Sequence, residues 1–255
     1  MNPGDRGARV ERYLARLREG GPMHWTLIDP DKSSGERAVA VARGAVELGT
    51  HAILLGGSTG ISREVMDRTC AAVKAAVGVP TIIFPEGPGS LTPEADAILF
   101  LSLLNSRDLD LVIRAHARAA PSIRAMGLET LPTGYLVIAP GMRVGEVGQV
   151  DPVPRDDREA ARGFALAAEM LGMRFVYLEA GSGAPQPVPP AMVRAVRDAI
   201  GATLIVGGGI RSGKDARPLL AAGADVLVTG TVTEEEGLGE GYRSILEEVK
   251  RVRAG

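Results

Sequence analysis

The sequence predicts a single (β/α)8 barrel over residues 1–255, and three observations support this fold class. The chain has 255 residues, which is close to the roughly 250 that such barrels take. Eight short apolar runs alternate with amphipathic stretches, as parallel strands covered by helices on both faces require. The 33 glycines are spread along the chain, as expected for many tight turns between strands and helices.

The predicted strands are the eight apolar runs, which are rich in Val, Ile and Leu. In chain order they are Met23–Ile28, His51–Leu55, Thr81–Phe84, Ala97–Leu101, Gly134–Ile138, Arg174–Leu178, Thr203–Val206 and Asp225–Val228. Each run is short enough to be a strand, and the residues around it carry turn signals.

Helical patterns with recognisable ends lie between the runs. Serines precede several of them as candidate N-caps, and glycines follow them as candidate C-caps. The predicted helices are Ala8–Arg18 ahead of the first strand, then Arg37–Leu48, Arg63–Val77, Asp108–Ala120, Asp156–Leu171, Pro190–Ile200, Ala216–Ala222 and Tyr242–Val252. The helix at 108–120 is predicted to end before Pro121, because proline disrupts helix interiors.

Two connections depart from the regular pattern. Between Phe84 and Ala97 there is room only for a short turn, so the third helix is predicted to be short or irregular. The longest stretch without periodicity, Ala139–Arg155, follows the fifth strand, on the face where barrels carry their active sites. A loop of that length predicts a lid, a binding segment or a mobile connector.

The composition excludes several classes of protein. The 29 basic and 31 acidic residues give a net charge of −2, so the chain as a whole does not attract nucleic acid. The single cysteine, Cys70, cannot form an intramolecular disulfide and is interpreted as a buried thiol. No run approaches the 18 or so apolar residues of a membrane span, and residues 1–14 lack the apolar core of a signal peptide. We therefore expect a cytoplasmic protein.

Glycine-rich segments follow the predicted strands six, seven and eight. They contain Gly181, Ser182 and Gly183, then Gly208 and Gly209, then Gly230 and Thr231. Backbone amides without a neighbouring Cβ, at the ends of strands seven and eight, are the usual phosphate cradle of this fold. The alternative is that these glycines only make tight turns.

Three other patterns carry little weight. The string from Gly208 to Lys214 resembles a P-loop, but Asp215 stands where Ser or Thr would hold magnesium. The glycines at 207 and 209 form only a fragment of a dinucleotide-binding motif. The three histidines are far apart and no cysteine pair accompanies them, so no zinc spacing exists.

Oxygen ligands follow the first two strands. Asp29 ends the first strand and Ser58 follows the second, and a carboxylate with a hydroxyl suits Mg²⁺ that keeps waters and shares substrate phosphates. Asp31 is an alternative ligand, and Lys32 could contact a phosphate or cap a helix. Asp29 could instead be a turn residue before Pro30.

A carboxylate also lies at the end of an otherwise apolar strand. Tyr177 and Glu179 are two residues apart on the sixth strand and therefore face the same side. At the barrel mouth Glu179 could accept a proton or bind a substrate hydroxyl; the alternative is an ion pair with Arg211 or Lys214. A phosphate-binding rim, a divalent ion opposite and a carboxylate near both indicate two phosphorylated substrates.

The motifs at the strand ends, taken together, resemble those of the geranylgeranylglyceryl phosphate synthase family and the related heptaprenylglyceryl phosphate synthases. The resemblance covers residue 23 to the C-terminus, and Y-L-E-A-G-S-G is its most specific part. The motifs are T-L-I-D-P-D-K (26–32), G-G-S-T-G (56–60), L-F-L-S-L-L-N-S (99–106), Y-L-E-A-G-S-G-A-P (177–185), V-G-G-G-I-R-S (206–212) and V-T-G-T (228–231).

The resemblance implies a (β/α)8 prenyltransferase. Such an enzyme transfers a prenyl group from a prenyl diphosphate to the C3 hydroxyl of sn-glycerol 1-phosphate, in the first ether bond of archaeal-type phospholipids, and requires Mg²⁺. Asp29 and Ser58 would hold the metal, and Glu179 would orient and deprotonate the hydroxyl. Glycerol phosphate would contact Tyr177, Leu178, Glu179, Ala180, Gly181, Ser182, Gly183, Gly208, Gly209, Gly230 and Thr231. A homodimer or homohexamer and transient contact with a membrane surface are also implied.

The resemblance leaves other functions open. Some family members carry Lys two residues before the metal-binding Asp, where this chain has Leu27, so one phosphate contact is missing. A related branch uses phosphoglycerate as acceptor. A metal-independent isomerase or epimerase of phosphosugars, or a barrel without catalysis, remains an alternative. Side chains deep in an apolar trough would set the prenyl length; Ile83, Phe84, Leu101 and the Ala139–Arg155 loop are candidates for its wall.

Overall fold

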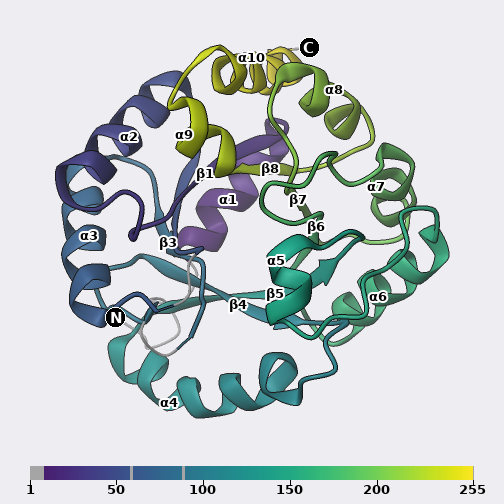
Figure 1. Ribbon diagram of the computed structural model, residues 1–255, viewed down its shortest axis with the longest axis horizontal. Helices are drawn as coiled ribbons and strands as arrows, with labels where there is room; N and C mark the ends of the chain where they lie inside the picture. The colour runs from purple at the N-terminus through teal and green to yellow at the C-terminus, as the bar shows by residue number, and fades with distance from the viewer. Residues whose placement is uncertain (1–8, 58–59, 88–89, 255) are drawn as a thin grey trace.

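The computed structural model describes residues 9–57, 60–87 and 90–254, and these form a closed parallel barrel with the strands in sequence order (Figure 1). The last strand pairs in parallel with the first, which completes the barrel. The strands are β1 Met23–Ile28, β2 Ala52–Leu55, β3 Thr81–Ile83, β4 Ala97–Leu103, β5 Glu129–Val137, β6 Phe175–Glu179, β7 Thr203–Gly207 and β8 Val226–Thr229. The predicted fold class is therefore confirmed.

Helices surround this barrel as the alternating sequence pattern predicts. They are α1 Arg9–Glu19, α2 Gly35–Leu48, α3 Arg63–Ala76, the π-helical segment η3 Asp110–Arg114, α4 Ala115–Met126, α5 Met142–Val147, α6 Arg158–Met170, α7 Pro190–Arg197, α8 Gly213–Ala221, α9 Thr231–Glu236 and α10 Glu240–Ala254. Serine and glycine cap two of the helices: the Ser62 side chain accepts a hydrogen bond from the Val65 amide ahead of α3, and Gly49 is left-handed at the end of α2.

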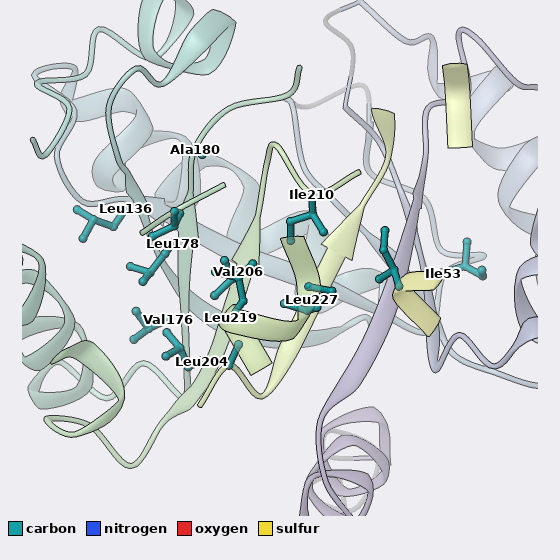
Figure 2. Packing of buried hydrophobic residues seen from close by; sticks show 14 of the residues in the cluster. Ile53, Leu136, Val176, Leu178, Ala180, Leu204, Val206, Ile210, Leu219 and Leu227 are labelled. Carbon is teal, nitrogen blue, oxygen red and sulfur yellow. The ribbon is translucent and has the colours of Figure 1, made fainter. Parts of the chain in front are cut away.

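The apolar side chains form an inner and an outer cluster. Inside the barrel, Trp25, Leu54 and Leu99 pack together with residues from the other strands. The outer cluster fills the space between the strands and the helices, and Figure 2 shows part of it, with Leu219 of α8 beside Val206 and Leu227. Two clusters follow from strands that are apolar on both faces, because successive side chains point to opposite sides.

The first helix covers one end of the barrel. Val10 and Leu14 of α1 are buried in the inner cluster. The carboxylate of Glu129, at the start of β5, accepts hydrogen bonds from the backbone amides of Val10 and Glu11, both at 2.8 Å. A buried carboxylate that receives the first amides of a helix is well placed for the helix dipole. This end is closed, so the opposite end carries the site.

Three predictions for individual elements were wrong. The helix expected to end before Pro121 continues through it to Met126; the buried Ile123 and the apolar pattern beyond the proline outweigh the lost hydrogen bond. Strand β5 begins at Glu129 rather than Gly134 and contains Pro132. The stretch predicted as a loop at 139–155 contains the short helix α5.

The connection after β3 contains no regular helix among its described residues, as predicted. Cys70 is fully buried, and burial raises the pKa of its thiol to about 12. Within the described ranges, none of the helices combines the length and apolarity needed to cross a bilayer.

Candidate active site

A cavity of about 790 Å³ opens where the strands end. Residues at or just after the ends of β2, β6, β7 and β8 line it, among them Gly57, Glu179, Gly208 and Gly230. From this mouth the lining continues along β4 and the inward face of α4. The volume lies in the upper part of the range for small-molecule sites, so the cavity can hold a substrate larger than a phosphosugar.

Glu179 lies at the end of β6 with only 6% of its surface exposed. Its Oε1 accepts a hydrogen bond from the Gly181 amide at 2.7 Å, and the hydroxyls of Tyr177 and Tyr135 also donate to the carboxylate. Burial raises the pKa of Glu179, and these three donors oppose the rise. The ion pair with Arg211 or Lys214, considered from sequence, does not form; Arg211 instead donates to backbone carbonyls of residues 183 and 184.

Tyr135 is a site residue that the sequence analysis missed. It lies on β5 directly opposite Tyr177 in the strand register, and the two rings meet edge to face with centroids 4.9 Å apart. Phe84 completes a trio, with centroids 6.0 Å from Tyr135 and 6.1 Å from Tyr177. Burial raises the pKa of both tyrosine hydroxyls well above their usual value. Both therefore stay protonated and act as donors to Glu179.

The end of β7 approaches these side chains closely. A Cβ on Gly207 would overlap the Tyr177 hydroxyl, and a Cβ on Gly208 would overlap Glu179 Oε1 and come within 2.7 Å of the Gly181 amide nitrogen. Gly208 also has φ of +79°, in the left-handed region that favours glycine. Glycine at 208 thus leaves room for the carboxylate as well as permitting the turn.

The segments predicted to form a phosphate cradle meet at one side of the mouth. Ser182, Gly183, Gly209 and Thr231 all line the cavity, and the hydroxyls of Ser182 and Thr231 lie 3.0 Å apart although 49 residues separate them. The segments after β6, β7 and β8 therefore converge as predicted. Hydroxyl and amide donors of this kind, on glycine-rich backbone, can surround a phosphate.

The start of α8 is satisfied within the protein. Asp215 Oδ2 accepts from the backbone nitrogens of Arg211 and Ser212, just before the helix, each at 3.0 Å. The Gly213 amide, the first of α8, donates to Ser244 Oγ at 2.9 Å. The hydroxyl donors that line the cavity here, those of Ser182 and Thr231, come from the segments after β6 and β8.

The first candidate metal ligand follows β1, the direct neighbour of β8 in the closed barrel. Asp29 is buried at the end of β1, and its Oδ1 accepts from the Asp31 amide at 3.0 Å. Its Oδ2 lies 3.6 Å from Lys32 Nζ. Ser58, the second predicted ligand, lies outside the described residues. Within the described part of the chain, no three His, Cys, Asp or Glu side chains gather as a metal cluster.

An apolar trough leads away from the mouth. Phe84 and Leu101, two predicted wall residues, line it, whereas Ile83 packs in the outer core. The loop after β5 contributes residues of α5, including Val144 and Val147. The opposite wall, which was not predicted from the sequence, is a face of α4 formed by residues three and four apart: Ala115, Ala119, Ser122 and Met126.

Three residues of the predicted glycerol phosphate site do not line the cavity. Leu178 and Ala180 belong to the outer core, and Figure 2 shows Leu178 among the packed side chains next to Val176 and Leu136. Gly181 contributes through its amide to Glu179. The alternation of a strand explains this arrangement, because Tyr177 and Glu179 point inward and Leu178 between them points outward.

A comparison with protein families and known proteins agrees with this geometry. The PcrB family model matches residues 15–250. Geranylgeranylglyceryl phosphate synthase from Pyrococcus furiosus is 47% identical over 243 residues, which cover 95% of this chain and 97% of the relative. The enzyme of that name from Methanothrix thermoacetophila is 51% identical over 218 residues, which cover 85% of this chain and 86% of the relative.

A solved structure is similar over the same extent. The crystal structure of (S)-3-O-geranylgeranylglyceryl phosphate synthase from Thermoplasma acidophilum, in complex with its substrate sn-glycerol-1-phosphate, superimposes with a TM-score of 0.91. It shares 42% sequence identity, and the match covers 96% of this chain and 99% of that chain. The similarity therefore extends over the barrel and its mouth.

Proposed function

Because this chain belongs to the PcrB family, we propose that it transfers a geranylgeranyl or similar prenyl group from a prenyl diphosphate to the C3 hydroxyl of sn-glycerol 1-phosphate. One observation carries this proposal: Glu179 lies in a single cavity between a glycine-rich cradle and an apolar trough. A cradle for one phosphate, a trough for a long apolar chain and a buried carboxylate where the two meet are the parts that the transfer needs.

The cradle is the proposed site of the acceptor. The Thermoplasma acidophilum relative was solved with sn-glycerol-1-phosphate as its substrate, and the loop residues of this chain offer the hydroxyls of Ser182 and Thr231 with the backbone of Gly209. Arg211 stabilises this loop, since its guanidinium donates to the Ala184 carbonyl at 2.7 Å. With the phosphate held there, the glycerol chain extends toward Glu179.

Glu179 is the proposed general base. Burial makes its carboxylate more basic than a solvated one, and the Tyr177 and Tyr135 hydroxyls hold it in one orientation. Glu179 would accept the proton of the C3 hydroxyl as that oxygen attacks C1 of the prenyl chain. The C–O bond to the diphosphate breaks in the same step, and the diphosphate leaves with the bonding electron pair.

The trough is the proposed site of the prenyl chain. Leu101, Leu103 and the apolar face of α4 line it, and with the prenyl chain bound they would exclude water and protect an allylic carbon as positive charge develops there. The rings of Phe84, Tyr135 and Tyr177 lie beside Glu179, and aromatic faces attract cations. These groups would stabilise the charge without a competing nucleophile.

Magnesium is proposed as the cofactor, and the described residues fit it in part. Asp29 supplies a hard oxygen ligand beside the mouth, and one or two carboxylates with water and substrate phosphate are the usual Mg²⁺ environment. Asp29 would hold the ion together with Ser58. When bound, Mg²⁺ would neutralise charge on the departing diphosphate.

An assay with several acceptors tests this function. The purified protein is incubated with geranylgeranyl diphosphate, Mg²⁺ and sn-glycerol 1-phosphate, and mass spectrometry detects the ether lipid. Parallel reactions contain sn-glycerol 3-phosphate, phosphoglycerate or EDTA. We expect product with sn-glycerol 1-phosphate and Mg²⁺ and at least about tenfold less in each parallel reaction, which corresponds to about 1.4 kcal/mol of discrimination. Product only with phosphoglycerate would replace the proposed acceptor, and no product with any acceptor would refute the proposed function.

A further inference from the structure

Lys32 lies between two carboxylates at the mouth of the cavity. Its Nζ is 2.7 Å from Glu234 Oε2 and 3.6 Å from Asp29 Oδ2. The side chain is 54% exposed and lines the cavity, as does Glu234. A lysine amine is a cation at neutral pH, so this contact with Glu234 is an ion pair.

The ion pair connects the two halves of the site. Lys32 belongs to the turn after β1, next to the proposed metal ligand Asp29, and its amide donates to the Asp29 carbonyl at 3.1 Å. Glu234 belongs to α9, which begins at Thr231 in the proposed phosphate cradle. Because β1 and β8 are direct neighbours in the closed barrel, the bridge joins the proposed donor side of the mouth to the proposed acceptor side.

A metal-bound diphosphate would change this arrangement. A divalent ion held by Asp29 would repel an ammonium group 3.6 Å from the same carboxylate. The diphosphate at the same time brings several negatively charged oxygens to the mouth, and these are stronger partners for an ammonium than one partly exposed carboxylate. The flexible four-carbon stem lets Lys32 change partner without a change in backbone.

We propose that Lys32 binds the diphosphate of the prenyl donor, and that Glu234 is its competing partner before the donor enters. The proposal rests on the proposed function for the identity of the donor. It assigns opposite roles to the two ends of one ion pair: Lys32 favours donor binding, and Glu234 opposes it by stabilising the enzyme without donor.

Because the two residues have opposite roles, their substitution should change KM for the prenyl donor in opposite directions. Lys32→Met should raise KM for geranylgeranyl diphosphate about 10- to 100-fold, because a charge-assisted hydrogen bond to phosphate is lost. Glu234→Gln should lower the same KM about two- to fivefold, since a partly exposed ion pair no longer competes. Neither variant should change KM for sn-glycerol 1-phosphate more than about twofold. Lys32→Arg should recover most of the donor affinity because it keeps the positive charge.

A neighbouring glutamate supplies the control. Glu235 lies on the same short helix and is exposed, so Glu235→Gln removes the same charge without touching Lys32 and should leave both KM values unchanged. If the bridge only fixes α9 in place, Lys32→Met and Glu234→Gln remove the same interaction. The two variants would then change KM for geranylgeranyl diphosphate in the same direction, and KM for sn-glycerol 1-phosphate likewise. That result would overturn the proposal.

A binding measurement separates this proposal from the proposed function. Isothermal titration of inorganic diphosphate with Mg²⁺ needs no turnover. We expect Kd to rise at least about tenfold in Lys32→Met and to fall in Glu234→Gln. If these changes in Kd occur but the wild type forms no ether lipid, Lys32 binds diphosphate as proposed and the proposed prenyl transfer is wrong. If Lys32→Met binds diphosphate as the wild type does, the proposal is refuted whatever the reaction.

Discussion

Glu179→Gln should lower kcat about 10²- to 10⁴-fold, the usual loss when a general base is removed. The amide has the same shape and keeps an oxygen for the Gly181 amide, but it cannot accept the proton of the attacking hydroxyl. KM for sn-glycerol 1-phosphate should change little, since the phosphate is bound by the loops. Steady-state kinetics with circular dichroism to verify folding would measure both.

Glu129→Gln is the matched control for Glu179→Gln. Glu129 is also a buried strand glutamate, but it receives amides of α1 at the closed end of the barrel. Its substitution should lower the melting temperature and leave kcat unchanged. Equal kcat in Glu179→Gln and the wild type would remove the base role from Glu179.

The pH dependence of kcat tests whether Glu179 acts as a base or as an acid. Because burial raises the pKa of Glu179 above its ordinary value of 4.5, kcat of the wild type should rise with pH through a midpoint above 4.5 and then level off as the carboxylate ionises. This limb should be missing from the residual activity of Glu179→Gln. A rate that falls as Glu179 ionises would indicate an acid instead of a base.

Gly208→Ala should lower kcat/KM about 10²-fold, the cost of displacing a catalytic group by roughly 1 Å. The new Cβ overlaps Glu179 Oε1 and lies 2.7 Å from the Gly181 nitrogen that holds it. The carboxylate must therefore move, and the hydrogen bonds that orient it must lengthen. The same kinetic assay measures the effect.

Backbone strain at Gly208 needs its own control, because φ is +79° there. Gly172 has φ of +86° and is exposed, and a Cβ added to it would meet no other atom within 4 Å. Gly172→Ala therefore adds comparable strain with no steric contact, and should reduce stability but not kcat/KM. If both variants lose activity equally, strain rather than displacement of Glu179 explains the loss.

The strands and the strand-end motifs could be predicted because each is a local pattern. Continuous apolar runs mark buried parallel strands, and a glutamate at the end of such a run, as at Glu179, has few structural explanations. The continuation of α4 past Pro121 could not be predicted, because the burial of residues such as Ile123 outweighs the tendency of a proline to end a helix. The short helix α5 has too few residues to show a period.

The parts of the site that sequence missed depend on distant pairing. Tyr135 resembles any core aromatic on a strand until the register places it opposite Tyr177. The partner of Lys32 is 202 residues away, and no local pattern links Glu234 to it. The α4 wall of the trough was hidden for a related reason: small residues such as Ala119 signal a cavity only once the facing strand is known.

The central claim is that the C3 oxygen of glycerol phosphate attacks the prenyl carbon, so that the prenyl C–O bond breaks and the C3–O bond of glycerol stays intact. It is tested most directly with sn-glycerol 1-phosphate that carries a heavy-isotope oxygen at C3. After incubation with geranylgeranyl diphosphate and Mg²⁺, mass spectrometry locates the label. We predict that all of it lies in the ether bond between glycerol and the prenyl chain and none in the released diphosphate. Label in the diphosphate, or an ether lipid whose label is in a free hydroxyl, would contradict the mechanism.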